Sequence, residues 1–292
     1  IYTTWGGLRA SIVTDQWQAF LLIGLLAIVG FVAMDRLPEL QMADAPSAPV
    51  GSALGVALTL VIAVTAANLF HQGYWQRLWS ARDTSALRSG ALLGGLVTII
   101  VVAVVGGLGI ATAMSGADLG SPPIPFFALL SGAPAWLTIP ALVLALTLVA
   151  SSVDTLQNAL ASLAVTEKQG LSIISARWVT VLLMIPVVIV ALQGVSVLRL
   201  FLIADLLCAT AVIPVLMGLW KRMTTTAAVF GGLAGLAGAI IPGWVTGGSL
   251  TAGVLAASFP GGIPTLEPFL GALAASAVVS LAITLVWGRK SN

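Results

Sequence analysis

The sequence predicts an all-α, polytopic helical membrane protein with about eight transmembrane helices. Hydrophobic residues make up 59% of the 292 positions and charged residues only 8%, and the mean hydropathy is +1.09. A soluble domain carries roughly 25% charged residues, so water does not surround most of this chain. The basic residues stand singly or in pairs between apolar runs and form no stripe or cluster, which argues against a nucleic-acid partner.

Each predicted span is an apolar run that ends where prolines or charged residues collect. A spanning helix needs about 20 mostly apolar residues, and eight stretches meet this requirement. They are 12–34, 51–70, 91–113, 135–163, 178–195, 198–220, 226–243 and 268–287. Prolines 38, 46 and 49 break the first connection, and the proline-rich segments 121–125 and 260–264 break two later ones.

The basic residues also predict an orientation, because Lys and Arg collect in cytoplasmic loops. With eight spans that start inside, ten of the 12 basic residues fall on the cytoplasmic side and only Arg36 and Arg199 fall outside. The ten are Arg9, Arg77, Arg82, Arg88, Lys168, Arg177, Lys221, Arg222, Arg289 and Lys290. Both ends of this segment are therefore expected in the cytoplasm, with the protein in the cell membrane.

Three short motifs occur in order along the chain: GGLRASIVTDQWQ at 6–18, QRLWSAR at 76–82 and SSVDT at 151–155. Together with LWKRMT at 219–224, they resemble the sodium:solute symporter family. In that family, the first motif lies at a loop-to-helix junction, the second follows the sixth core helix, and the third carries a sodium site. The resemblance begins partway through the family pattern and implies a C-terminal portion that lacks the first four core helices.

The resemblance implies one transmembrane domain over 1–292, part of a transporter fold with two inverted five-helix repeats. Span 12–34 would be the last helix of the first repeat, 51–220 would hold the second repeat, and 226–292 would hold peripheral helices. The sixth core helix is expected to break within 61–73. The implied function is symport of a small polar solute with sodium by alternating access. No enzyme activity and no organic cofactor are expected, and sodium is the coupling ion.

The resemblance also assigns ion ligands. Sodium would be bound by the hydroxyl groups of Ser151 and Ser152 and the backbone carbonyl of Leu148, while Asp15 and Asp154 would lie on the ion pathway. The remaining ligands in the family belong to the first core helix, so residues 1–292 alone are not expected to transport. Other interpretations stay open, since helix serines commonly bond to carbonyls of the preceding turn. In the alternative interpretation of Asp15, the carboxylate is a charge at a helix N-terminus and Arg9 is its neighbour.

The candidates for solute binding lie at two places in the sequence, a predicted helix break and an intramembrane carboxylate. Those at the break are Asn68, Phe70, His71 and Gln72. Asp205 lies inside an apolar span, and such a carboxylate is a site hypothesis by default. It would meet a cationic group of the solute or pair with Arg199. Trp75 and Trp79 are typical of an aromatic belt at the inner membrane interface.

Two other functions remain open at this stage. A transporter-like domain can serve as the sensor of a signalling protein. A proton-coupled carrier would use Asp205, Asp154 or His71 in place of sodium. Glycine-rich stretches such as 106–109 and 231–238 lie inside apolar spans. They predict close helix packing rather than nucleotide binding, because small residues let membrane helices approach one another.

Overall fold

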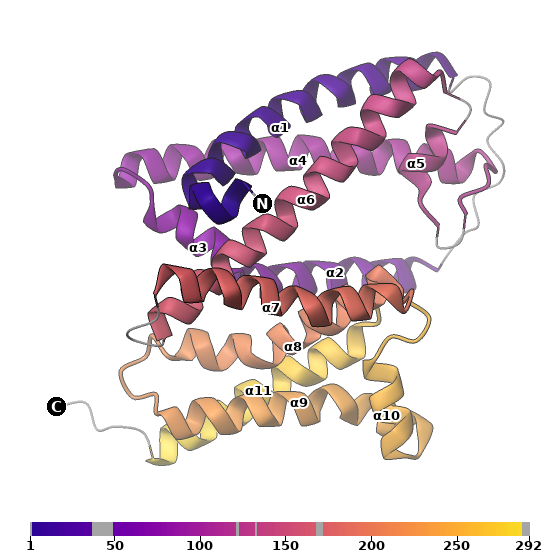
Figure 1. Ribbon diagram of the computed structural model, residues 1–292. Coiled ribbons are helices and arrows are strands. Elements are labelled where there is room, and N and C mark those ends of the chain that lie inside the picture. The colour runs from indigo at the N-terminus through magenta and orange to yellow at the C-terminus, as the bar shows by residue number, and fades with distance from the viewer. Residues whose placement is uncertain (1, 37–48, 121–122, 132, 168–171, 288–292) are drawn as a thin grey trace. The chain divides into compact units, whose positions relative to one another are not determined.

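The computed structural model describes residues 2–36, 49–120, 123–131, 133–167 and 172–287, and within these ranges it is all-helical (Figure 1). The helices are α1 Tyr2–Arg36, α2 Val50–Phe70, α3 Gln72–Trp79, α4 Thr84–Met114, α5 Pro125–Leu129, α6 Ala135–Glu167, α7 Ile173–Leu192, α8 Val197–Met217, α9 Thr225–Gly247, α10 Leu250–Ala257 and α11 Leu266–Trp287. The predicted fold class is confirmed.

Seven of these helices, α1, α2, α4, α6, α8, α9 and α11, are long and apolar enough to cross a membrane. The eighth predicted span, 178–195, falls mostly on α7, whose apolar part Val181–Leu192 is shorter. Some residues used above lie outside the described part, as whole residues or as side chains: Arg9, Arg36, Pro38, Pro46, Pro122, Lys168, Arg177, Arg289 and Lys290.

The chain divides into two compact units. Unit 1 contains Ile1–Pro46 and Gln72–Val187, and unit 2 contains Ser47–His71 and Val188–Asn292. Each unit is described by itself below.

In unit 1, α6 packs against α1 and α3, and α4 packs against α1 and α5. Val29, Leu130, Leu137 and Ala141 form its buried apolar cluster. Helix α1 runs without interruption through the glycine pair at 6–7. The predicted loop-to-helix junction before Asp15 is therefore wrong: Asp15 lies inside α1, and the low helix propensity of two glycines, about 1 kcal/mol each relative to alanine, does not interrupt a helix of 35 residues.

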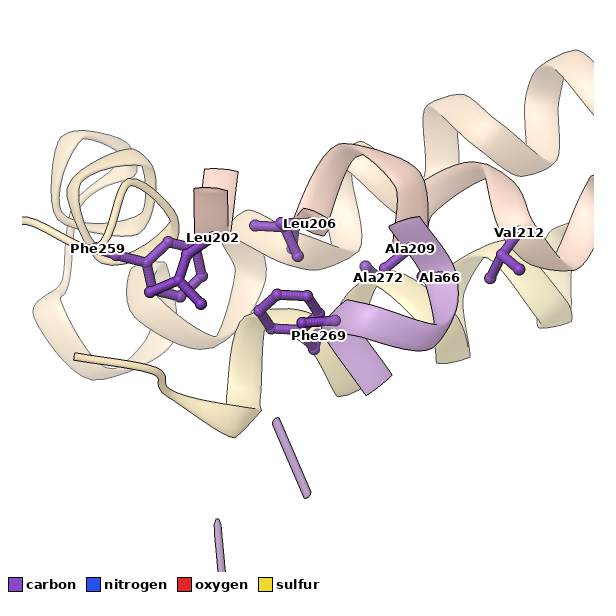
Figure 2. Packing of buried hydrophobic residues seen from close by; sticks show 10 residues of the cluster. Ala66, Leu202, Leu206, Ala209, Val212, Phe259, Phe269 and Ala272 are labelled. Atoms are coloured by element: carbon purple, nitrogen blue, oxygen red, sulfur yellow. The ribbon is translucent and has the colours of Figure 1, made fainter. Parts of the chain in front are cut away.

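In unit 2, α8 lies against α2, α9 and α11, and α9 also packs on α10 and α11. Figure 2 shows the buried residues of this core, with the Phe259 and Phe269 rings beside Leu202 and Leu206. The glycines of α9 allow close approach, as expected. A Cβ on Gly238 would lie 2.2 Å from the carbonyl oxygen of Gly271 on α11.

The predicted break after the second span is present. Helix α2 ends at Phe70, His71 has φ −77° and ψ 94°, and α3 begins at Gln72. The interruption lies inside the predicted interval 61–73. It also coincides with the boundary between the two units.

Candidate ion and solute sites

A polar cluster lies where α1, α3 and α6 of unit 1 meet. Arg77 on α3 donates from Nη2 to Asp15 Oδ2 on α1 at 2.5 Å. The same nitrogen lies 3.4 Å from Ser11 Oγ and 3.3 Å from Thr155 Oγ1, and Nη1 donates to the Gly73 carbonyl at 3.1 Å. One guanidinium therefore joins three helices.

Ser151 completes this arrangement from α6. Its hydroxyl donates to Asp15 Oδ1 at 2.6 Å, so both carboxylate oxygens of Asp15 have partners. The side chains of Arg77 and Asp15 are 29% and 32% exposed, and Ser151 is 7% exposed. We call these residues, Ser11, Asp15, Arg77, Ser151 and Thr155, the Asp15 cluster.

Local helical spacing explains how the cluster forms. Residues four apart lie on one face of a helix, and this applies to Ser11 and Asp15 on α1 and to Ser151 and Thr155 on α6. The two faces meet because α1 packs on α6. The sequence pointed to Arg9 as the neighbour of Asp15; the partner in the described structure is Arg77, 62 residues further along the chain.

The three predicted sodium ligands lie within about one turn of α6. The exposed Ser152 donates its hydroxyl to the Leu148 carbonyl at 3.0 Å, which is the bond that the alternative interpretation expected. Ser151 instead points to Asp15. A hydroxyl that donates one hydrogen bond keeps its lone pairs, and hard cations take oxygen ligands. The oxygens of this turn can therefore still contribute to a sodium site.

The predicted solute residues at the helix break belong to both units. Asn68 and Phe70 are exposed at the end of α2 in unit 2, and His71 is the non-helical residue after them. Gln72 belongs to unit 1, where it lines a shallow groove together with Gln76.

Asp205 is the clearest candidate for a charged solute. It is 2% exposed on α8, and its Oδ2 atom has no hydrogen-bond partner in the described part of the chain. The predicted pair with Arg199 is not formed: Arg199 donates to the Ser258 carbonyl at 2.8 Å and to Ser258 Oγ at 3.2 Å. Residues six apart on a helix differ by roughly 240° around its axis, so Arg199 and Asp205 face different neighbours.

The helices around Asp205 supply no compensating charge. Helices α2, α9 and α11 pack on α8, and none of them contains Lys, Arg or His within its bounds. The core cluster of this unit consists of alanine, leucine, phenylalanine and valine side chains, with isoleucine and Cys208 packed against it. An isolated carboxylate in such surroundings is costly unless it meets a cation or a proton.

Comparison with known proteins adds one relative. No model of a known protein family matches the chain, and no solved structure matches it. A spermidine transporter of Candida albicans is 30% identical over 230 residues, which cover 75% of this chain and 44% of that protein. The chain thus spans less than half the length of this curated relative. The seven apolar helices are those of a multi-pass membrane protein, and the relative is described as a transporter.

Proposed function

We propose that the protein is a secondary active transporter that couples the entry of sodium to the uptake of a small polar solute. The observation that carries this proposal is the turn of α6 that holds Leu148, Ser151 and Ser152 beside the carboxylate of Asp15. The similarity to a spermidine transporter supports the transport function. The motifs that resemble the sodium:solute symporters support the choice of ion.

In this proposal, sodium binds to the oxygens of the α6 turn, and Asp15 and Asp154 guide it toward the cytoplasm. Sodium must bind one conformation more tightly than the other, since a ligand shifts an equilibrium only by its differential affinity. Alternating access then exposes the ion and the solute to the cytoplasm together. The distribution of basic residues supports a cytoplasmic position for the end of the helices that carries Arg77.

The candidate solute residues remain Asn68, Phe70, His71, Gln72 and Asp205. Among them, Asp205 favours a solute with a protonated nitrogen, because its buried carboxylate has one oxygen without a hydrogen-bond partner. The relative is described as transporting spermidine, which is a flexible cationic amine. Spermidine is therefore the first solute to test, with urea as a neutral comparison.

The test is uptake of labelled solutes into proteoliposomes that carry the full-length protein, with and without an inward sodium gradient, because residues 1–292 alone are not expected to transport. The wild type is compared with the double variant Ser151→Ala and Ser152→Ala. A matched control is Thr138→Ala on the same helix, whose hydroxyl contacts only carbonyls of its own preceding turn. Loss of sodium-stimulated uptake in the double variant alone is expected. Uptake that ignores sodium in the wild type, or that survives unchanged in the double variant, would refute sodium coupling at this turn.

A further inference from the structure

A shallow groove lies between α3 and the C-terminal half of α6, both in unit 1. Its volume is about 480 Å³. One aromatic and five neutral polar side chains line it: Gln72, Gln76, Trp79, Ser80, Asn158 and Ser162. Neither the sodium turn nor Asp205 belongs to this lining, so the groove is a separate place on the molecule.

Helical spacing brings these side chains together. Gln72 and Gln76 are four residues apart on α3, and Asn158 and Ser162 are four apart on α6, so each pair shares a helix face. On α6, this face continues the line of Ser151 and Thr155 from the Asp15 cluster. The groove therefore begins about one turn beyond the charged pair, toward the end of α6 that is predicted to be cytoplasmic.

The side-chain amides of the groove are available to a ligand. The side-chain amide groups of Gln72, Gln76 and Asn158 have no hydrogen-bond partner within the described ranges of the chain, and all three residues are half-buried. Each amide offers a carbonyl oxygen as an acceptor, and Ser80 and Ser162 add hydroxyl oxygens. Several acceptors thus converge on a space that is open to solvent.

The charges around the groove favour a cation. None of the lining residues is charged. Asp154 lies four residues before Asn158 on the same side of α6, is half-buried, and forms no ion pair in the part of the chain that the structure describes. The positive charge of Arg77 is compensated by Asp15. Trp79 is 83% exposed and belongs to the lining, and alkylammonium groups bind to indole rings through cation–π attraction.

We propose that this groove binds a protonated amine of the transported solute on the inner side of the membrane, as a station before release. This inference rests on the proposed function for the choice of solute. The amide and hydroxyl oxygens accept the N–H groups of the amine, Trp79 covers its methylene chain, and Asp154 supplies the charge. A flexible polyamine fits this series of separated acceptors better than a compact solute does.

Protection of an introduced cysteine tests the groove without relying on transport. Cys208 is the only natural cysteine, so a Cys208→Ser background carries Ser162→Cys in the groove or, as a matched control, Gln157→Cys outside its lining. A membrane-impermeant maleimide is applied to the inner face of vesicles. Spermidine, urea, or potassium chloride at the ionic strength of the spermidine sample is present during labelling.

Spermidine should slow the labelling of Ser162→Cys but not that of Gln157→Cys, and urea and potassium chloride should slow neither. Replacing Asp154 by Asn should raise the half-protecting spermidine concentration by about three- to tenfold, since hydrogen bonds to charged groups are among the stronger ones and water weakens this one. Trp79→Leu should raise it by about fivefold, as expected for a cation–π contact that is lost.

Equal labelling with and without spermidine would overturn the inference, as would equal protection by urea or by potassium chloride. The result stays separate from the proposed function because labelling reports occupancy of the groove and not uptake. Protection without any uptake would keep the groove and remove the transport proposal. Sodium-driven uptake of spermidine without protection would keep the transport proposal and overturn the groove as a binding site.

Discussion

The ion pair between Asp15 and Arg77 should be worth about 1–2 kcal/mol to the stability of unit 1. Two unit charges 4 Å apart attract by roughly 4 kcal/mol at an effective dielectric constant near 20, and exposed pairs contribute about 1 kcal/mol or less. The two side chains are 29% and 32% exposed, which places this pair between those limits. Arg77 also contacts Ser11 and Thr155, so it connects α1, α3 and α6.

A double-mutant cycle with Asp15→Asn and Arg77→Gln measures this coupling. Reversible unfolding in mixed micelles, followed by tryptophan fluorescence, gives the free energy of unfolding of each variant. We expect each single variant to lose about as much stability as the double variant, since either change removes the same interaction. A matched control is the pair Arg82 and Asp83, whose side chains are 86% and 45% exposed and which should show a much smaller coupling.

Additive losses would refute this reasoning. If the double variant lost the sum of the two single losses to within about 0.5 kcal/mol, the two side chains would be energetically independent. Asp15 would then depend on its hydrogen bond with Ser151 alone, and the connection between the three helices would not run through Arg77.

Asp205→Leu should abolish spermidine uptake and leave the free energy of unfolding unchanged or higher, because it removes a buried oxygen without a hydrogen-bond partner; a large loss of stability in the same preparation would contradict this. Gly238→Val should lower the free energy of unfolding by about 2–3 kcal/mol through overpacking, because a Cβ there lies 2.2 Å from a carbonyl oxygen, whereas Gly232→Ala has nothing within 4 Å and should not destabilise. The hydrogen bond from the Ala86 amide, followed by a neighbouring guanidinium, holds the pKa of Asp83 below its usual 3.8. The cap on α4 should therefore be complete above about pH 3.8 and weaken as the pH falls through the lowered pKa. Asp83→Ala should leave the Ala86 amide with the same low protection against hydrogen exchange at every pH.

The long helices were predictable because each is an apolar run of spanning length between polar or proline-rich segments. The ends of these helices were less predictable. Asp83 caps α4 through the Ala86 amide, so the helix begins at Thr84, seven residues before the predicted apolar run. The short helices α3, α5 and α10 were missed, since their 5–8 residues are too few for a hydropathy pattern.

The candidate site was predictable only in part. Motif positions singled out Asp15 and Ser151, and the structure places them 2.6 Å apart. Spacing along the chain did not predict Arg77 as the partner of Asp15, because this contact depends on how α1, α3 and α6 pack rather than on local sequence. For the same reason, the sequence could propose Arg199 as a partner of Asp205 although helix geometry turns the two side chains to different faces.

Asp15 and Asp205 are both carboxylates in apolar helices, but their partners and their solvent exposure differ. Asp15 has a guanidinium and a hydroxyl as partners and keeps some contact with solvent, so its presence is explained by packing of three helices. Asp205 is 2% exposed, and its Oδ2 atom has no hydrogen-bond partner among the described residues, so its burial is costly to the fold. A group of this kind is better explained by a cation that visits it than by the resting fold. Variants of the two sites should then have different effects on sodium dependence and on selectivity for solute charge. Changes at Ser151 and Ser152 should alter the sodium requirement for every solute, and changes at Asp205 should affect cationic solutes and spare neutral ones.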